Sequence, residues 1–143
     1  MPEQTLTLWS TPFAALTPGT TFTTPERVLT QDDISVFAAL TGDHHPQHVD
    51  TGWAANSAFG GTIAHGLLVL SAAAGLVPFD PERVVALRRV DDVVFKRPVR
   101  PGDAIRVEGT IDQLRDPGIV GAKWRVVGPE GLCVRARVEV LWR

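Results

Sequence analysis

The sequence has a single cysteine, no long hydrophobic run and no excess of charge of one sign. Cys133 cannot form a disulfide within the chain, and its apolar and polar neighbours alternate as they do around a small buried side chain. The longest apolar stretch, residues 66–78, is too short to span a bilayer, and no basic stretch followed by an apolar run begins the chain. These absences predict a cytoplasmic protein that does not enter membranes.

Basic and acidic residues are mixed along the chain. The 14 basic and 16 acidic side chains give a formal net charge of -2, without a basic stripe, a charge block or a repeat. Proteins that bind nucleic acid concentrate positive charge to neutralise phosphates, so we expect no nucleic-acid partner. The length of 143 residues and the 44% of hydrophobic residues fit one globular domain over residues 1–143.

A helix is predicted after an extended piece near residues 21–29. The hydroxyl of Thr30 can accept a hydrogen bond from the amide of Asp33, which is the pattern of a helix N-cap. Apolar side chains follow at helical spacing, and Gly42 is suited to end the helix. Asp43 therefore begins a loop directly after a helix.

Two further helices are expected before residue 78. Pro46 disfavours helical geometry, so residues 43–48 are not expected to form a regular helix. Asp50 is expected to cap a short helix that ends near Ala55. Residues 67–77 are apolar on nearly every side, which predicts a core helix that other structure must wrap.

The second half of the chain predicts strands, at residues 84–85, 93–95, 105–111, 120–127 and 132–142. In the last of them, apolar residues alternate with Arg135, Arg137 and Glu139, as in a sheet with one solvated face. Clusters of proline, glycine and aspartate separate the later strands, which fits an antiparallel meander. We therefore predict an α+β fold in which a curved antiparallel sheet wraps the apolar helix from about Gly66 to Val77.

All four histidines lie between residues 44 and 65, and three of them share one loop with Asp43. An Asp and a His held on a rigid loop can bind a water and move its protons, because the imidazole pKa lies near neutrality. We interpret Asp43 and His48 as such an acid-base pair.

Solvated histidines clustered by chance and a metal site are the alternatives. The possible metal ligands are Asp43, His44, His45, His48 and Asp50, although they complete no familiar zinc pattern.

Gly66 begins the apolar helix, where its N–H lacks a helical partner. Such an N–H, reinforced by the helix dipole, can stabilise a developing oxyanion. Tight packing that leaves no room for a Cβ is an equally supported interpretation. His65 is expected to orient this turn through a backbone hydrogen bond. Ser71 and Cys133 lack the glycine-flanked turn and adjacent base of a catalytic nucleophile.

Three segments in order carry a resemblance to a known family: residues 37–50 with Ala54 and Ala55, residues 59–67, and residues 95–103. The first contains the run Gly42-Asp43-His44-His45-Pro46-Gln47-His48. Together they resemble the MaoC-like dehydratases, the (R)-specific enoyl-CoA hydratases of the hot-dog fold. The resemblance implies that Asp43 and His48 activate the water that adds to the β-carbon of a trans-2-enoyl thioester. It also implies that the Gly66 amide polarises the thioester carbonyl.

Three positions depart from the family's pattern. His45 stands where the family usually has Asn, so it either takes over the hydrogen bonds of that residue or changes the charge near Asp43. Gln47 replaces a branched aliphatic residue. Ala74 lies near the position of a serine that often supports the aspartate.

The resemblance further implies a hydratase or dehydratase for an acyl-CoA or acyl-carrier-protein thioester, with no metal or redox cofactor. It implies a homodimer or larger homo-oligomer, with sheets joined edge to edge and the acyl pocket between subunits. His45, His65 and Arg97 are the expected substrate contacts. Candidates for the CoA phosphates, if they are not simply a solvated strand face, are Arg88, Arg89, Lys96, Arg97 and Arg100. A thioesterase of the same fold and a non-catalytic acyl-CoA binding module are the alternative functions.

Overall fold

The computed structural model describes residues 7–143. Its strands are β1 (Thr21–Thr23), β2 (Arg27–Val28), β3 (Val84–Phe95), β4 (Ala104–Arg115), β5 (Ile119–Gly128) and β6 (Gly131–Trp142). They form one antiparallel sheet in the order β1-β4-β5-β6-β3, and β2 also pairs with β4. Successive hairpins join β4, β5 and β6, as the predicted meander requires.

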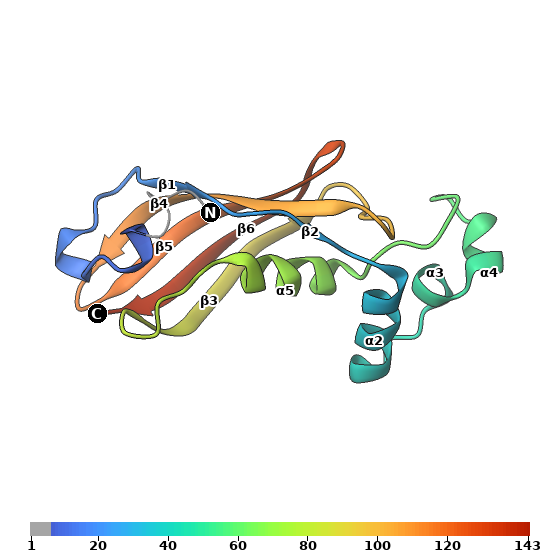
Figure 1. Cartoon of the computed structure of the whole chain (residues 1–143), viewed down its shortest axis with the longest axis horizontal. Helices are drawn as coiled ribbons and strands as arrows, with labels where there is room; N and C mark the ends of the chain where they lie inside the picture. The colour runs from blue at the N-terminus through green and yellow to red at the C-terminus, as the bar shows by residue number, and fades with distance from the viewer. Residues whose placement is uncertain (1–6) are drawn as a thin grey trace.

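The helices are η1 (Phe13–Ala15), α2 (Gln31–Thr41), α3 (Pro46–Val49), α4 (Thr51–Ala55) and α5 (Gly66–Leu76). Figure 1 shows α5 along one face of the curved sheet, with α2, α3 and α4 beyond the end of the sheet, beside the first turn of α5. This is the α+β hot-dog arrangement that was predicted. No helix within residues 7–143 is long and apolar enough to cross a membrane.

The sheet face that covers α5 carries the hydrophobic core. Alternate residues of β6, from Val134 to Trp142, are buried there, and Leu68, Val69 and Ala73 of α5 belong to the same cluster. The residues between them in β6 include the exposed Arg135, so the predicted period-two alternation is confirmed. Burial of these apolar side chains holds the helix against the sheet.

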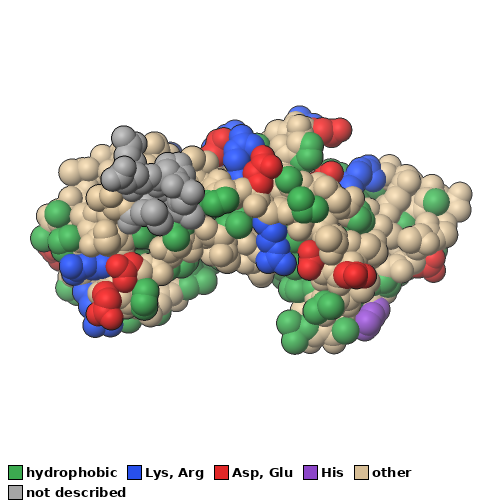
Figure 2. All heavy atoms as spheres, viewed as in Figure 1, with side chains coloured by type: hydrophobic (Ala, Val, Ile, Leu, Met, Phe, Trp, Pro, Cys, Tyr) green, Lys and Arg blue, Asp and Glu red, His purple; other side chains and the backbone are tan. Residues whose placement is uncertain are grey.

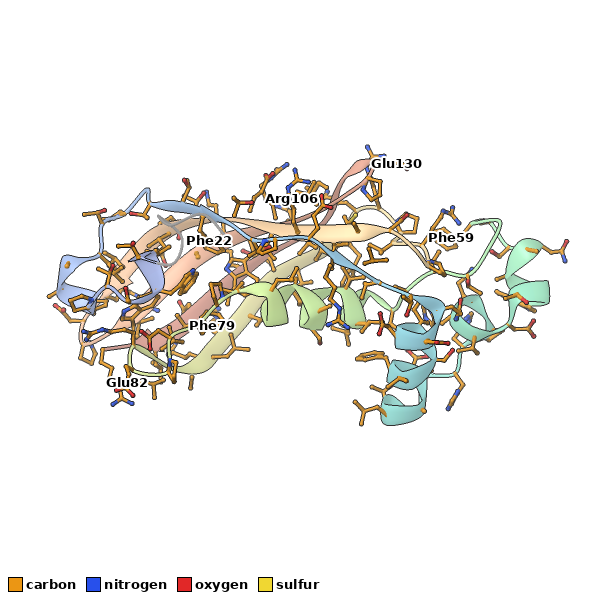
Figure 3. All side chains as sticks on the ribbon, in the orientation of Figure 1. Phe22, Phe59, Phe79, Glu82, Arg106 and Glu130 are labelled. Atoms are coloured by element: carbon orange, nitrogen blue, oxygen red, sulfur yellow. The ribbon has the colours of Figure 1, made fainter. Side chains whose placement is uncertain are left out.

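Aromatic side chains fill the core at the C-terminal end of α5. Trp9 contacts Phe22, Phe79 and Trp142 with ring centroids 5.1, 5.1 and 5.3 Å away. Figure 3 shows Phe22 and Phe79 at the end of the molecule opposite to Phe59. Only about 10 Å³ of open space remains among these rings. A ligand pocket therefore has to lie at the other end, near the start of α5.

The curved sheet covers one face of α5, and the opposite face of the helix is exposed. Leu67 is 63% exposed on the outer face of the helix, and Ser71 and Gly75 are exposed there as well. The reason is that the sheet ends at β3, which has a neighbour only on its β6 side. Within one chain, the outer side of this apolar helix has no cover.

The edge strand β3 is longer than predicted. It runs without interruption from Val84 to Phe95, where two short strands were expected on either side of a charged middle segment. Its pairing with β6 continues through Arg89 and Asp91, with register shifts along the way. Charged residues are tolerated in that segment because an edge strand leaves them in contact with water.

Candidate active site

The C-terminal end of α2 sets the position of Asp43. As predicted, the helix starts at an N-cap in which the N–H of Asp33 donates to the Thr30 hydroxyl (3.1 Å). The N–H of Thr30 in turn donates to the Asp33 carboxylate (3.0 Å), which completes a capping box that was not predicted. Gly42 ends the helix in the left-handed region, with a φ of 82° that favours glycine. The chain turns there, and Asp43 follows at the mouth of a pocket.

Pro46 begins the short helix α3, so the prediction that residues 43–48 contain no regular helix is wrong for Pro46, Gln47 and His48. A proline at the first helical position fits, because its fixed φ is helical and its missing N–H would have no partner there. The N–H of Gln47 donates to Nδ1 of His45 at 3.0 Å. His45 is therefore the N-cap of α3, a role for which Asn is also well suited.

The ring of His48 is held in one tautomer. Its Nδ1 lies 2.8 Å from the carbonyl oxygen of Ile63, and because a carbonyl only accepts, Nδ1 carries the proton. In the neutral ring, Nε2 is then free to accept a hydrogen bond. The side chain of Gln31 donates to the backbone carbonyl of His48 at 3.0 Å and fixes that turn from the side of α2.

His65 connects the start of α5 to the loop that carries Asp43. Its Nε2 donates to the carbonyl oxygen of Asp43 at 3.0 Å, so the expected backbone hydrogen bond is present and goes to that loop. The ring is 3% exposed, stacks on His48 at a centroid distance of 3.8 Å and meets Phe37 at 4.9 Å. Its Nδ1 is buried and has no hydrogen-bond partner in residues 7–143. These contacts hold Asp43 and His48 together.

Gly66 has the geometry that each of the two interpretations requires. It is the first residue of α5, where no carbonyl of the helix can accept its N–H, and the described residues supply no other acceptor. A Cβ placed on Gly66 would lie 2.6 Å from Cε1 of Phe95, so any larger residue would displace that ring. The glycine thus leaves both an unpaired N–H and room for Phe95.

These groups line a pocket of about 510 Å³ between the α2–α4 segment and the sheet. Asp43, His48, His65 and Gly66 lie in its polar part, to which Thr41, Lys96 and Arg97 also belong. The remaining walls are mainly apolar side chains, which are Phe37, Phe59, Ile63, Ala64, Leu67, Val69, Phe95, Pro98, Val99 and Val134. The pocket thus brings a carboxylate, two histidine rings, a free backbone N–H and apolar walls together.

The other predicted site residues lie partly outside this pocket. His45 does not line the pocket, and its ring faces Trp53 with centroids 5.5 Å apart. His44 is exposed, and the Asp50 carboxylate caps α4 by accepting the N–H of Trp53 at 2.9 Å, as predicted. Arg97 lies on the pocket wall.

A metal ion does not fit this cluster. A carboxylate oxygen of Asp43 and ring nitrogens of His48 and His65 lie within 4.8 Å of one another. Each histidine coordinates through a lone pair in the plane of its ring, but these two rings are stacked with an interplanar angle of 23°. Their lone pairs lie in nearly parallel planes and cannot converge on one ion. The other ligands considered from the sequence, His45 and Asp50, are occupied as helix caps.

Sequence reasoning missed two kinds of residue around the site. Phe59 and Phe95 were recognised only within the family motifs, yet both line the pocket. A polar network also supports the turn at His48: the Thr62 hydroxyl donates to the Gln31 side chain at 2.8 Å, and the Gln47 side chain donates to the carbonyl of Gly61 at 2.9 Å. No local sequence signal indicates these contacts, because they join residues 14 to 31 positions apart.

Three further residues discussed from the sequence lie outside the pocket. Ala74 lies two turns after Gly66 on α5 and does not line the pocket with Asp43, so within one chain this position is remote from the aspartate. Cys133 is buried, and burial raises the pKa of its thiol, which disfavours the reactive thiolate. Ser71 is exposed on α5, away from the acid-base pair.

Comparison with known proteins adds independent information. The model of the MaoC like domain matches residues 13–118. Protein MaoC of Klebsiella aerogenes is 43% identical over 99 residues, which cover 68% of this chain and 30% of that protein. The (R)-specific enoyl-CoA hydratase of Aeromonas caviae is 33% identical over 84 residues, which cover 59% of this chain and 63% of the hydratase. The chain thus spans less than two thirds of either relative.

Solved structures agree with the fold over most of the chain. The structure titled monoamine oxidase regulatory protein, from Archaeoglobus, has a TM-score of 0.84 and 34% sequence identity. The match covers 93% of this chain and 94% of that one, so it includes the α2–α4 segment as well as the sheet.

Proposed function

This chain belongs to the MaoC-like domain family, and we propose that it catalyses the hydration of an enoyl thioester and the reverse dehydration of a 3-hydroxyacyl thioester. Relatives named (R)-specific enoyl-CoA hydratase and 3-hydroxyacyl-thioester dehydratase support this reaction class. The first of these names supports, as part of the proposal, an (R)-configuration at the new hydroxyl.

The observation that carries the proposal is the pairing of two hydrogen-bond acceptors at the pocket. The Asp43 carboxylate accepts only, and His48 presents an unprotonated Nε2 because its Nδ1 donates to Ile63. One water can donate a hydrogen to each of them, since the polar atoms of the cluster lie within 4.8 Å of one another. The lone pairs of that water then face the substrate.

The reaction breaks one O–H bond of water and the C=C π bond, forms a C–O and a C–H bond, and requires the enzyme only to transfer protons. The water oxygen attacks the β-carbon and forms a C–O bond while Asp43 and His48 take up its proton, and the π electrons of the double bond move to the thioester oxygen. When the carbonyl re-forms, the α-carbon takes a proton returned through the same groups. One water is consumed, no atom changes its oxidation state outside the substrate, and no metal or redox cofactor enters the proposed step.

The first turn of α5 is the proposed oxyanion site. Negative charge develops on the thioester oxygen during the attack, and the unpaired Gly66 N–H with the helix dipole favours that charge. His65 acts indirectly, because its hydrogen bond to the Asp43 carbonyl fixes the carboxylate relative to this N–H. Apolar walls exclude competing water from the acyl chain.

We also propose that two copies associate through β3 and the outer face of α5. Leu87 on β3 is 60% exposed and Leu67 on α5 is 63% exposed, and β3 exposes three further large apolar side chains, Val85, Val90 and Phe95. Because Leu67 and Phe95 also line the pocket, a second copy at this surface would close one side of it. This supports the expected homodimer.

Product analysis with crotonyl-CoA tests the proposed reaction. The wild type is expected to form 3-hydroxybutyryl-CoA without releasing free CoA. Asp43→Asn and His48→Asn are expected to lower kcat/KM by about 100-fold or more, the range for losing one general acid-base group. Asn at position 48 keeps an N–H near the carbonyl of Ile63 but lacks Nε2.

His44→Asn is the matched control, because His44 is exposed on the same loop and does not line the pocket. It is expected to retain full activity. Release of free CoA by the wild type, at a rate that Asp43→Asn does not change, would identify a thioesterase that does not depend on this pair. Binding of crotonyl-CoA without turnover would identify a binding module.

A further inference from the structure

The backbone of Asp43 is held on both sides by side chains of the site. Its carbonyl oxygen accepts the Nε2–H of His65 at 3.0 Å, and its N–H donates to the Thr41 hydroxyl at 3.2 Å. Thr41 lines the pocket and is the last residue of α2, whereas His65 directly precedes α5. The peptide groups before and after Asp43 are therefore anchored to two helices, which lie beside each other at this end of the sheet (Figure 1).

The Thr41 hydroxyl is itself fixed in direction. It donates to the carbonyl oxygen of Phe37 at 2.8 Å, so a lone pair of the oxygen remains for the N–H of Asp43. The ring of Phe37 in turn packs against His65, with centroids 4.9 Å apart. These residues form a closed ring of contacts that runs from Thr41 through Phe37 and His65 to Asp43 and back to Thr41. A rotation of the Asp43 backbone would break at least one of the contacts.

The backbone of this turn offers no substitute for the Thr41 hydroxyl. The N–H of Gly42 donates to the carbonyl of Ala38 at 2.8 Å, and the N–H of His44 donates to the carbonyl of Gly42 at 3.1 Å. The Asp43 N–H, which lies between them in sequence, has no acceptor other than Thr41 within residues 7–143. Loss of the hydroxyl would therefore release one of the two anchors.

The orientation of the Asp43 backbone decides where its carboxylate points. Oδ1 accepts the N–H of His45 at 3.4 Å, which is a long hydrogen bond and restrains the side chain only weakly. Oδ2 has no hydrogen-bond partner in the described part of the chain. Because the carboxylate makes so few contacts of its own, the two backbone anchors fix its position relative to the His48 ring.

We propose that Thr41 is a positioning residue for the reaction, whose hydroxyl orients the Asp43 carboxylate toward the water shared with Nε2 of His48. The inference rests on the proposed hydratase function. Thr41 itself transfers no proton, because its O–H is bonded to the carbonyl of Phe37. It holds Asp43 where one water can donate to both acceptors, and such alignment of reacting groups contributes directly to the rate.

Thr41→Val tests the role of the hydroxyl, because it removes that group and keeps the size of the side chain. The kcat for hydration of crotonyl-CoA is expected to fall about tenfold through misalignment of Asp43. KM is expected to stay unchanged, because the apolar walls of the pocket are intact. Thr41→Ser keeps the hydroxyl and is expected to have the kcat of the wild type.

Thr11→Val is the matched control. The Thr11 hydroxyl also donates to a carbonyl four residues earlier, that of Thr7, at 2.8 Å, and Thr11 does not line the pocket. This substitution makes the same chemical change far from Asp43 in the fold, so kcat is expected to be retained. A loss of kcat equal to that of Thr41→Val would overturn the inference, because it would reflect a general effect of removing such a hydroxyl.

Combination with Asp43→Asn distinguishes positioning from a structural effect. If Thr41 acts through the carboxylate, adding Thr41→Val to Asp43→Asn lowers kcat no further. A tenfold loss that persists in the Asp43→Asn background would overturn the inference, as would a Thr41→Ser variant as slow as Thr41→Val. So would an unchanged kcat of Thr41→Val beside a reduced kcat of Asp43→Asn, although the proposed reaction would then stand. Full hydratase activity of Asp43→Asn would instead overturn the proposed mechanism, and this inference with it.

Discussion

At the scale of single residues, hydrogen-bond partners determine what each histidine of the cluster can do. His48 donates through Nδ1 to Ile63, His65 donates through Nε2 to Asp43, and His45 accepts through Nδ1 from Gln47. In the pocket, Nε2 of His48 is left to accept a hydrogen bond beside the Asp43 carboxylate, whereas the unpartnered Nδ1 of His65 is buried. These three histidines therefore have different roles.

The proposed role of the Gly66 N–H can be tested with proline. Gly66 occupies the first position of α5, where proline fits, and His65 before it has φ -57° and ψ 136°, the conformation that a residue before proline prefers. Because any Cβ at this site collides with Phe95, we compare Gly66→Pro with Gly66→Ala, each combined with Phe95→Ala. We expect the proline variant to have a kcat about 100-fold lower, as for loss of one oxyanion donor.

Thermal unfolding of both double variants provides the control, since their stabilities should be close if proline is accepted at this position. Equal kcat values for the proline and alanine variants would show that the N–H has no part in the reaction. In that case, the glycine at position 66 would be explained by the packing of Phe95 alone.

Local residue pairs were predictable from the sequence, and distant ones were not. The bond between Thr30 and Asp33 and the cap at Asp50 follow from residues three positions apart. The bond between His65 and Asp43 joins residues 22 positions apart and depends on how α5 packs against the loop after α2. The sequence therefore predicted that His65 forms a backbone hydrogen bond but not its partner.

At the scale of elements, α2 positions Asp43, which follows directly after the end of the helix. The capping box at the start of α2 stabilises the helix, and its contribution can be measured. The N–H of Thr30 lowers the pKa of Asp33 below its ordinary value of 3.8, and Arg27 acts in the same direction. A depressed folded-state pKa means that the carboxylate stabilises the fold above pH 3.8 and loses this effect as the pH falls through that value and below.

Asp33→Ala is thus expected to destabilise the protein by about 1 kcal/mol at neutral pH, and the difference from the wild type should shrink below pH 3.8. Urea denaturation at several pH values measures both effects. Asp32→Ala is the matched control, because Asp32 lies in the same first turn and accepts no cap hydrogen bond. Equal losses for the two variants would contradict the capping explanation.

The short helix α3 shows how element prediction failed at the site. Pro46 was taken as a helix breaker, but it stands at the first helical position, where proline is compatible with the helix. The start of α3 is stabilised by the cap at His45, whose Nδ1 accepts the N–H of Gln47. This cap could not be recognised from the sequence, because histidine is not among the residues that usually indicate an N-cap. By contrast, the apolar pattern of α5 and the alternation in β6 were sufficient for their prediction.

At the scale of the whole molecule, the described chain has an uncovered apolar side. Figure 2 shows that the segment around α2 projects from the body and leaves a hollow beside it, and Figure 1 places α5 next to this hollow. The edge strand β3 exposes several large apolar side chains on the same part of the fold. Sequence patterns predicted an apolar helix, but not which of its faces the chain itself would leave open.

Leu87→Glu is expected to convert a dimer into a monomer, because it places a charge in the middle of the apolar β3 surface. Size-exclusion chromatography with light scattering measures the change. Val28→Glu is the control: Val28 is 52% exposed on β2, at the opposite side of the sheet order, and its substitution should leave the mass unchanged. A wild type that is monomeric at all concentrations would refute the proposed association.

The most direct test of the central claim is the fate of the water oxygen. Crotonyl-CoA is incubated with the enzyme in water enriched in the heavy oxygen isotope, and the products are analysed by mass spectrometry. If Asp43 and His48 direct water at the β-carbon, the label will appear in the C3 hydroxyl of 3-hydroxybutyryl-CoA, and Asp43→Asn will abolish it. Label in the carboxylate of free crotonate, with release of CoA, would contradict the account.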